Sequence, residues 1–423
     1  MKAAVYTLGC KVNQYESQVI AESLAAHGYE IVDASQQADV YIVNSCTVTS
    51  ESDRKTRQVV RRLRRINPQA AVLLTGCMPQ AYPDKANALT AADIVVGNRD
   101  NAKIPDILDR YFAEPQRLLL TEPHRAGDAF APCCVHTFGG KTRAEIKIED
   151  GCNRFCSYCA IPYARGRVRS KALDDIRAEA AALGEAGYCE IVLVGINLSA
   201  YRDGDADICD AVRAASEHKN VRRVRLGSLE PDHLTDDVLL RLSRCEKLCP
   251  QFHISLQSGC NATLRRMNRH YTAAEYADLC AKLRRLFPDC TLTTDIMVGF
   301  PCETEDDHRQ SLRFAETIGF EKVHVFPYSP RSGTRAAAMD GQVPKAVKEQ
   351  RAAEMIAATN EIRQTFLQLQ IGRSVDVLVE DGREGYTANY TPVHIEGDCP
   401  PSGSMVWVQI TGVHHGQCVG VCL

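Results

Sequence analysis

Short apolar strands alternate with amphipathic helices along most of this 423-residue chain, and this alternation constrains the fold more than any other feature. In the first hundred residues, strands are predicted at 3–8, 40–43, 71–75 and 93–96, and helices at 15–27 and 51–66. A strand–helix alternation of this kind is typical of a parallel sheet covered by helices on both faces. We therefore predict an α/β chain that begins with a doubly wound parallel sheet.

The alternation resumes after a segment rich in proline and glycine. Six further strands are predicted at 144–148, 190–194, 223–226, 252–256, 291–298 and 322–326, with helices between them. Six βα units predict a partial (β/α)6 barrel, whose working face lies at the carboxyl ends of its strands.

The last fifty residues have a different pattern. After a long predicted helix that ends near residue 370, apolar and polar residues alternate around Val377 and Val408. This period predicts a small antiparallel β-barrel, a class of fold that commonly binds nucleic acid. Tyr386, Tyr390 and Trp407 are either stacking platforms for bases or core aromatics. The predicted organisation is 1–112, a linker at 113–142, 143–370 and 371–423.

Composition indicates an ordinary globular protein of the reducing cytoplasm. The chain is 45% hydrophobic and 24% charged, with a net charge of −3, so any affinity for nucleic acid must come from local basic patches. Nineteen cysteines would suggest disulfides in a secreted protein, but we recognise no signal peptide. No run approaches the roughly 20 apolar residues of a membrane helix, so no membrane partner is expected.

Cys152, Cys156 and Cys159 follow the predicted strand 144–148 with the spacing C-x3-C-x2-C. So short a loop can offer three thiolates to a [4Fe–4S] cluster and leave the fourth iron open for a small molecule, whereas four-cysteine loops close that position. Zinc sites usually pair two C-x2-C knuckles, and no second pair follows. The loop therefore predicts an iron–sulfur cluster with one open iron.

Three further cysteines occupy equivalent positions in the N-terminal sheet. Each follows a predicted parallel strand, at the edge where such sheets bind ligands: Cys10, Cys46 and Cys77. Gly9 and Gly76 precede two of them and allow close approach of the backbone. The repeated position favours a second three-cysteine cluster over three buried structural cysteines.

Basic residues gather on the predicted helix 51–66. Arginines that could contact RNA phosphates lie near its end: Arg61, Arg62, Arg64 and Arg65. A run of this kind is usually a solvated face. Beside a nucleic-acid-binding barrel, phosphate contacts become the favoured interpretation.

The cluster loop, including Tyr158, resembles that of the radical S-adenosylmethionine (SAM) enzymes. Almost the whole chain resembles the methylthiotransferase family, with its C-terminal TRAM barrel. The motifs that carry this resemblance are Gly9–Ser17, the cluster loop with Ile161–Gly166, Leu256–Gly259, Met267–Arg269 and Asp295–Pro301. The resemblance implies two [4Fe–4S] clusters and SAM as cofactors. Residues expected to line the SAM side are Tyr158, Gly195, Asn197, Glu230 and Gln257.

Within that family, the opening motif and the segment 324–329 are similar to the branch that acts on N6-threonylcarbamoyladenosine at position 37 of tRNA. The implied reaction is methylthiolation of C2, with a flavodoxin- or ferredoxin-like reductant and a sulfur donor as further partners. Alternatives are N6-isopentenyladenosine in tRNA or a ribosomal aspartate as substrate, or a non-catalytic RNA-binding or electron-transfer protein. Arg165, Arg225 or Arg269 is expected to pair with the substrate carboxylate.

Overall fold

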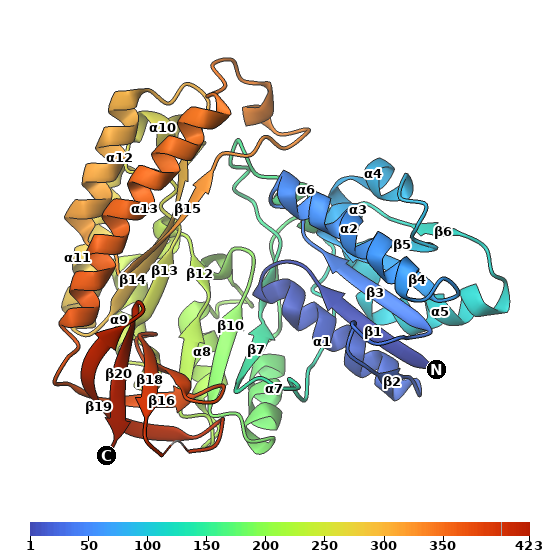
Figure 1. Ribbon diagram of the computed structural model, residues 1–423, viewed down its shortest axis with the longest axis horizontal. Helices are drawn as coiled ribbons and strands as arrows, with labels where there is room; N and C mark the ends of the chain where they lie inside the picture. Colours follow the sequence, from blue (N-terminus) through green and yellow to red (C-terminus); the bar gives the residue numbers. More distant parts are fainter. Residues whose placement is uncertain (399) are drawn as a thin grey trace.

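The computed structural model describes residues 1–398 and 400–423. The chain forms an N-terminal sheet, a curved central sheet and a small C-terminal barrel, and the N-terminal sheet lies beside the central one (Figure 1). Helices α11 (Ala273–Leu286) and α12 (Glu305–Ile318) cover the side of the central sheet turned away from the N-terminal sheet. None of the described helices has the length and apolar character needed to cross a bilayer.

The N-terminal sheet is parallel throughout and has the strand order β2-β1-β3-β4-β5-β6. Its strands are β1 (Lys2–Thr7), β2 (Glu30–Ile31), β3 (Val40–Ser45), β4 (Ala71–Gly76), β5 (Ile94–Val96) and β6 (Leu118–Leu120). Its helices are α1 (Lys11–Ala26), α2 (Ser50–Ile66), α3 (Cys77–Ala81), α4 (Pro83–Asn87) and α5 (Ile104–Ala113), with the 3₁₀ helix η1 (Asn98–Lys103).

Separate hydrophobic cores lie on the two faces of this sheet, which confirms the doubly wound prediction. Val60 and Leu63 of α2 pack against one face, and Ile20 of α1 and Leu108 of α5 pack against the other. The central strands β3 and β4 are buried along their whole length, as is typical of parallel strands covered on both sides. The short edge strands β2 and β6 were not predicted, and β6 lies within the segment 113–142 predicted as a linker.

The central sheet is an open barrel in two parts, β11-β10-β7 and β12-β13-β14-β15, all parallel. Its strands are β7 (Arg143–Lys147), β10 (Glu190–Val194), β11 (Arg223–Leu226), β12 (Ser228–Leu229), β13 (Gln251–Ile254), β14 (Thr291–Val298) and β15 (Lys322–Pro327). The other helices are α7 (Leu173–Glu185), α8 (Ile208–Ser216), α9 (Asp236–Ser243), α10 (Asn261–Arg266) and α13 (Lys345–Gln368).

Short elements occupy the loops at the carboxyl ends of these strands. They are β8 (Glu149–Asp150), α6 (Ile161–Arg165), β9 (Arg169–Ser170), η2 (Leu198–Ala200), η3 (Pro231–His233) and η4 (Arg335–Ala338). The six predicted strands are thus present, and the partial barrel is confirmed. The sheet divides between β11 and β12, which are separated in the chain by the single residue Gly227.

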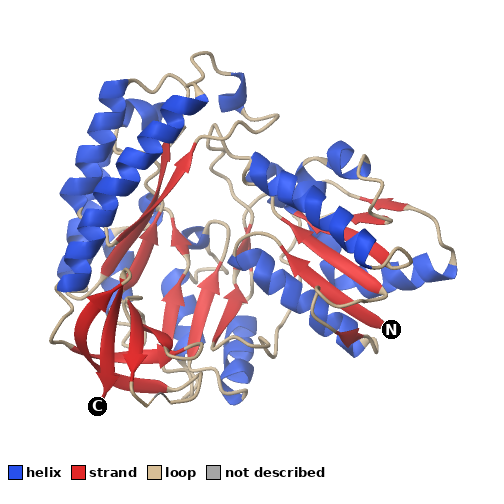
Figure 2. Cartoon of the chain, viewed as in Figure 1, coloured by secondary structure: helices blue, strands red, loops and turns tan. Residues whose placement is uncertain are grey.

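The C-terminal residues form a closed barrel of order β16-β17-β18-β20-β19, visible as a separate group of strands in Figure 2. Its strands are β16 (Ser374–Val379), β17 (Glu384–Thr387), β18 (Pro392–Glu396), β19 (Met405–His414) and β20 (Gln417–Cys422). The predicted small barrel is confirmed, although β18 and β20 pair in parallel. Val377, Ile395 and Val408 are among its fully buried core residues.

The barrel is attached to the amino ends of β10 and β11 by buried arginines. Arg225 donates to Glu190 Oε1 at 2.8 Å and to the carbonyl of Ala388 at 2.9 Å, and its guanidinium lies 4.7 Å from the centre of the Tyr390 ring. Tyr386 and Tyr390 stack on each other with ring centres 4.5 Å apart. These two tyrosines therefore fill an interface within the chain, whereas Trp407 is 61% exposed.

We predict that Arg225→Met lowers the free energy of unfolding by about 2–4 kcal/mol, because the buried Glu190 loses one of its partners. Arg222→Met changes the exposed residue that immediately precedes β11 and should alter stability by less than about 0.5 kcal/mol. Urea unfolding of the two variants at equal iron content measures the difference. Equal stability would mean that the Arg225 contacts do not hold the barrel in place.

Candidate functional site

Three cysteines lie in the loop after β8, at the carboxyl end of β7: Cys152, Cys156 and Cys159. Ser157 anchors this loop, because its backbone N–H donates to the carbonyl of Met267 at 3.0 Å and its hydroxyl donates to that of Arg266 at 2.8 Å. Phe155 has a φ of +49°, a left-handed conformation that turns the backbone between the first two cysteines. The end of α10 therefore holds the cysteine loop over the sheet.

The three thiols suit a positively charged iron centre. Burial raises the pKa of Cys152 to about 12, and it raises that of Cys159 as well, with the neighbouring thiolates adding to both shifts. Backbone N–H groups of Arg154 and Ile161 lie 3.5 and 3.4 Å from the sulfurs of Cys152 and Cys159. Buried thiolates need a compensating cation, which the irons of a cluster provide.

A cluster with several irons does not require its protein ligands to converge on one metal ion. Among residues 1–398 and 400–423, no three His, Cys, Asp or Glu side chains converge closely enough to hold one metal ion. A cubane takes each thiolate on a different iron, so its ligands need not converge on a single point. Both cysteine sets are compatible with such a cluster.

A buried arginine contacts the sulfur of Cys156. Arg269 Nη1 lies 3.3 Å from Cys156 Sγ and 3.2 Å from Glu230 Oε1, and Arg269 Nε donates to the Tyr271 hydroxyl at 2.9 Å. The ion pair with Glu230 neutralises the arginine and fixes its plane. Glu230, predicted on the SAM side, is therefore also a partner of the residue that touches the cysteine loop.

The other residues predicted to line the SAM side lie at neighbouring strand ends. The Nδ2 atom of Asn197 lies 4.0 Å from Cys152 Sγ. At Gly195 an added Cβ would lie 2.8 Å from Glu149 Oε2, so only glycine fits without a shift. Tyr158 packs edge-on against Phe300 with ring centres 6.3 Å apart.

The last of this set, Gln257, has a φ of +67° and donates its backbone N–H to the Asp295 carbonyl at 2.8 Å. Buried polar atoms without a hydrogen-bond partner include Asn197 Oδ1, Glu149 Oε1 and the Tyr328 hydroxyl. Such atoms are costly unless a ligand or water satisfies them. Asn197 and Glu149 are joined by a hydrogen bond of 2.7 Å, and their free oxygens could accept hydrogen bonds from the amine or hydroxyl groups of SAM.

The N-terminal cysteines gather at one edge of the other sheet. Cys10 precedes α1, Cys46 follows β3, and Cys77 follows β4. Burial raises the pKa of Cys77 to about 12, and the charges of Cys46 and Cys10 raise it further. Gly76 has a φ of +96°, and a Cβ there would lie 2.4 Å from the carbonyl oxygen of Ser45. The three predicted ligands therefore lie at the same edge of the sheet, and their role as ligands stays a prediction.

The three arginines expected to meet a substrate carboxylate are all engaged elsewhere. Buried ion pairs join them to carboxylates of the chain itself: Arg165 to Glu16, Arg225 to Glu190 and Arg269 to Glu230. Arg225 also faces the C-terminal barrel, where it donates to the Ala388 carbonyl. That expectation is corrected here, because none of these guanidinium groups is available to a carboxylate from outside.

The basic helix α2 divides into two kinds of arginine. Arg64 pairs with Asp93 and donates to the carbonyls of Ala70 and Ala91, so it has a structural role. The other three predicted RNA contacts are exposed: Arg61, Arg62 and Arg65. They line a surface hollow of about 420 Å³ together with Lys55 and Tyr6. The 3.6-residue period of an α-helix could have predicted that Arg64 lies closer to the buried face of α2 than the exposed arginines do.

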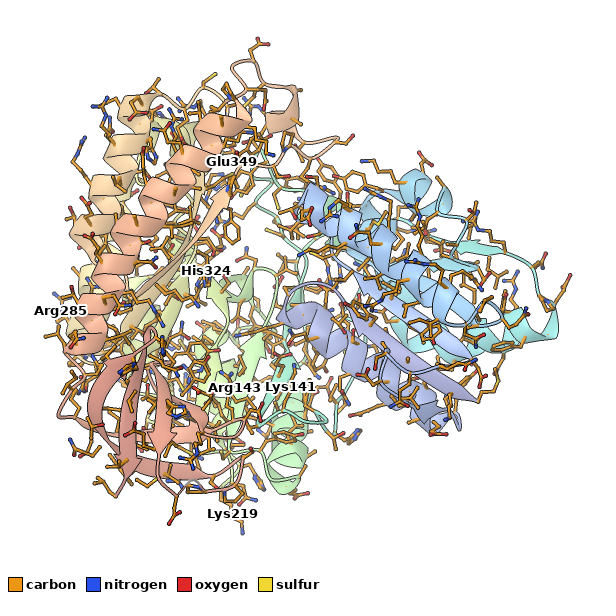
Figure 3. The ribbon with its side chains drawn as sticks, in the orientation of Figure 1. Lys141, Arg143, Lys219, Arg285, His324 and Glu349 are labelled. Atoms are coloured by element: carbon orange, nitrogen blue, oxygen red, sulfur yellow. The ribbon has the colours of Figure 1, made fainter. Side chains whose placement is uncertain are left out.

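The inner face of the central sheet carries polar groups that the sequence analysis missed. His253 Nε2 lies 3.4 Å from Asp295 Oδ2, and the rings of His253 and His324 are 5.8 Å apart. On β15 the inner side chains of Lys322, His324 and Phe326 are exposed, and Figure 3 places His324 on the side toward the N-terminal sheet. The alternation along β15 indicated which side chains share a face of the sheet, but it did not indicate which of the two faces is exposed.

Family models match the two larger parts of the chain. Residues 2–97 match a family described as Uncharacterized protein family UPF0004. Residues 146–315 match the Radical SAM superfamily and include the cysteine loop.

Curated relatives extend the similarity to nearly the full length. The chain is 37% identical to threonylcarbamoyladenosine tRNA methylthiotransferase MtaB of Bacillus subtilis, over 96% of this chain and 93% of that protein. It is 37% identical to the MtaB protein of Thermotoga maritima, over 89% and 86% of the two chains. It is 33% identical to tRNA-2-methylthio-N(6)-dimethylallyladenosine synthase of Clostridium perfringens, over 98% and 96%.

Solved structures agree in fold. The radical S-adenosylmethionine methyltransferase TsrM of Kitasatospora setae superposes with a TM-score of 0.57 at 15% identity, over 79% of this chain and 77% of that one. The protein is thus a transferase, with [4Fe–4S] clusters and SAM as its cofactors. Its full-length similarity to the curated enzymes means that the chain belongs to the radical SAM methylthiotransferase family.

Proposed function

We propose that this enzyme methylthiolates C2 of N6-threonylcarbamoyladenosine at position 37 of tRNA. The observation that carries the proposal is the 37% identity, over 96% of the chain, to a relative named for threonylcarbamoyladenosine. Relatives named for dimethylallyladenosine are 32–33% identical over similar lengths. That second substrate is therefore the alternative outcome of the test.

The two sets of cysteines would hold two clusters with different roles. Cys152, Cys156 and Cys159 would hold the cluster whose open iron binds SAM, and Cys10, Cys46 and Cys77 would hold the second cluster. Together with SAM, these groups supply radical chemistry that can activate an unreactive aromatic C–H bond. Asn197, Gly195, Tyr158, Glu230 and Gln257 would bind and orient SAM beside the cysteine loop.

The N6 substituent of the substrate carries a carboxylate, and the inner face of β15 offers cations to receive it. Lys322 and His324 are exposed there, and no ion pair to Lys322 occurs among the described residues. Asp295, opposite His324 in the strand register, could accept hydrogen bonds from the hydroxyl or amide groups of the substituent. These residues replace the three buried arginines as the proposed contacts.

The remaining partners follow from this reaction. Arg61, Arg62 and Arg65 would contact tRNA phosphates, and the exposed Trp407 would stack on RNA. A flavodoxin- or ferredoxin-like reductant would supply electrons, a separate donor would supply sulfur, and the cytoplasm would be the site of action. The division at residues 112, 142 and 370 stays a prediction.

Nucleoside mass spectrometry tests the substrate directly. Deletion of the gene should remove the 2-methylthio group from N6-threonylcarbamoyladenosine and leave the unmodified precursor, and the intact gene on a plasmid should restore the group. Methylthiolated isopentenyladenosine serves as the internal control and should not change. Loss of that nucleoside instead would move the enzyme to the other branch.

Substitution of the cations on β15 tests the proposed carboxylate contacts. Lys322→Gln combined with His324→Gln should raise KM for tRNA bearing the threonylcarbamoyl group by roughly tenfold or more, because a charge-assisted bond contributes about 1.5–3 kcal/mol. Reductive SAM cleavage without tRNA should be unchanged. Lys219→Gln, an exposed lysine elsewhere, is the matched control. An unchanged KM would place the carboxylate somewhere else.

Salt dependence of tRNA binding tests the exposed face of α2. Replacing Arg61, Arg62 and Arg65 with glutamine should weaken binding and lower the slope of log K against log salt by about 2–3, since each lost phosphate contact contributes about 0.7–0.9. The control replaces three exposed arginines on other surfaces: Arg110, Arg244 and Arg285. If both triple variants retain the original slope, α2 is only a solvated face.

A further inference from the structure

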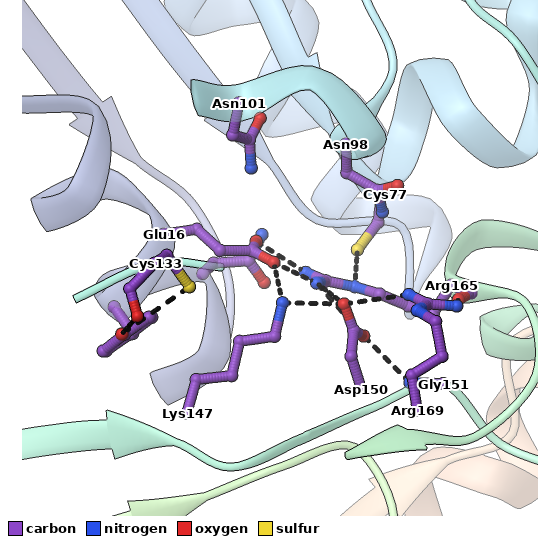
Figure 4. Close-up of polar contacts among 12 residues, drawn as sticks. Glu16, Cys77, Asn98, Asn101, Cys133, Lys147, Asp150, Gly151, Arg165 and Arg169 are labelled. Carbon is purple, nitrogen blue, oxygen red and sulfur yellow. Dashed lines mark hydrogen bonds and ion pairs between the residues drawn. The ribbon is translucent and has the colours of Figure 1, made fainter. Parts of the chain in front are cut away.

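A buried arginine from the central sheet reaches the sulfur of an N-terminal cysteine. Arg165, the last residue of α6, is fully buried, and its Nε atom lies 3.2 Å from Cys77 Sγ. Its Nη2 atom donates to Glu16 Oε2 of α1 at 2.9 Å (Figure 4). One guanidinium therefore joins the element that follows the cysteine loop to a cysteine of the other sheet.

The charges around Arg165 do not balance within the ion-pair cluster that Figure 4 shows. Lys147 Nζ lies 2.7 Å from both Glu16 Oε1 and Asp150 Oδ2, and Arg169 Nη2 lies 3.2 Å from Asp150 Oδ2. Three cations thus share two carboxylates. Buried charge is costly unless it is paired. The remaining positive charge faces Cys77, whose thiolate would balance it.

The same arrangement occurs at the other cysteine set. Arg269 lies between the Glu230 carboxylate and Cys156 Sγ, as Arg165 lies between Glu16 and Cys77 Sγ. In both places a carboxylate holds the guanidinium, and an N–H group points at a sulfur. The repetition links this geometry with cysteines that serve as cluster ligands, because hydrogen bonds to such sulfurs tune a cluster.

We propose that Arg165 is a positioning residue that raises the reduction potential of the N-terminal cluster and holds that cluster toward the Cys152–Cys159 loop. The proposal rests on the assignment of Cys10, Cys46 and Cys77 as cluster ligands. A hydrogen bond and a positive charge at the Cys77 sulfur stabilise the more negative, reduced cluster, so the potential rises. Because α6 directly follows the cysteine loop, the same residue ties the two ligand sets together.

A redox titration monitored by electron paramagnetic resonance tests this inference. Cys152, Cys156 and Cys159 are first replaced by alanine, so that only the N-terminal cluster contributes iron and signal. In that full-length background, Arg165→Gln should lower the midpoint potential, and Arg165→Lys should lower it less. Arg169→Lys is the matched control, because Arg169 shares Asp150 but makes no hydrogen bond to a cysteine sulfur among the described residues, so this variant should leave the midpoint potential unchanged.

The outcomes separate the two proposals. A parent protein without iron would overturn the ligand assignment, whereas roughly four irons per chain with an unchanged potential in both Arg165 variants would overturn only the role of Arg165. If both Arg165 variants lose their iron, the midpoint potential of the Glu16→Gln variant tests the role of Arg165 instead. Removal of that carboxylate leaves Arg165 on Cys77 and should raise the midpoint potential, and an unshifted value would refute the proposal.

Discussion

Buried ion pairs between two sheets are the interaction on which the whole arrangement depends. The N-terminal sheet has a hydrophobic core on each face, and apolar residues of α1 such as Val12 and Tyr15 also pack against the central sheet. Apolar contact alone is non-directional, whereas Glu16 pairs with Lys147 and Arg165 across the boundary, and Asp53 pairs with Arg331 at a second point. A buried charge that loses its partner is strongly destabilising, so these pairs fix the orientation of the two sheets. The same orientation places the two cysteine sets on facing edges.

The fold was largely predictable because its signals are local. Short, mostly apolar segments such as Val40–Ser45 and Glu190–Val194 are predicted as strands from their own residues, and alternation with helices then determines a parallel order. The cysteine loop was predictable for the same reason, since its spacing lies within eight residues. The short edge strands β2 and β6 were not predicted, because two or three residues are too few to show a hydrophobic period.

The partners of charged side chains were not predictable from the sequence. Arg165 and Glu16 are 149 residues apart, and Arg225 meets the Ala388 carbonyl 163 residues away. A period tells which residues share a face, but not which distant charge that face will meet. The expectation that a buried arginine would receive the substrate carboxylate failed for this reason. The open inner face of β15 was hidden as well, because sequence cannot tell a filled barrel from one that leaves room for a ligand.

The position of the C-terminal barrel sets a minimum size for an RNA that could contact both the barrel and the cysteine loop. The barrel is docked at the amino ends of β10 and β11, and the cysteine loop is at the carboxyl end of β7. A five-residue strand spans about 16 Å, so a nucleic acid that touches both must bridge at least that distance. An isolated nucleoside is too small to do so. A barrel that contacts RNA, as proposed, would therefore bind the stem that leads to the reacting base, and the open sheet would bind the base itself.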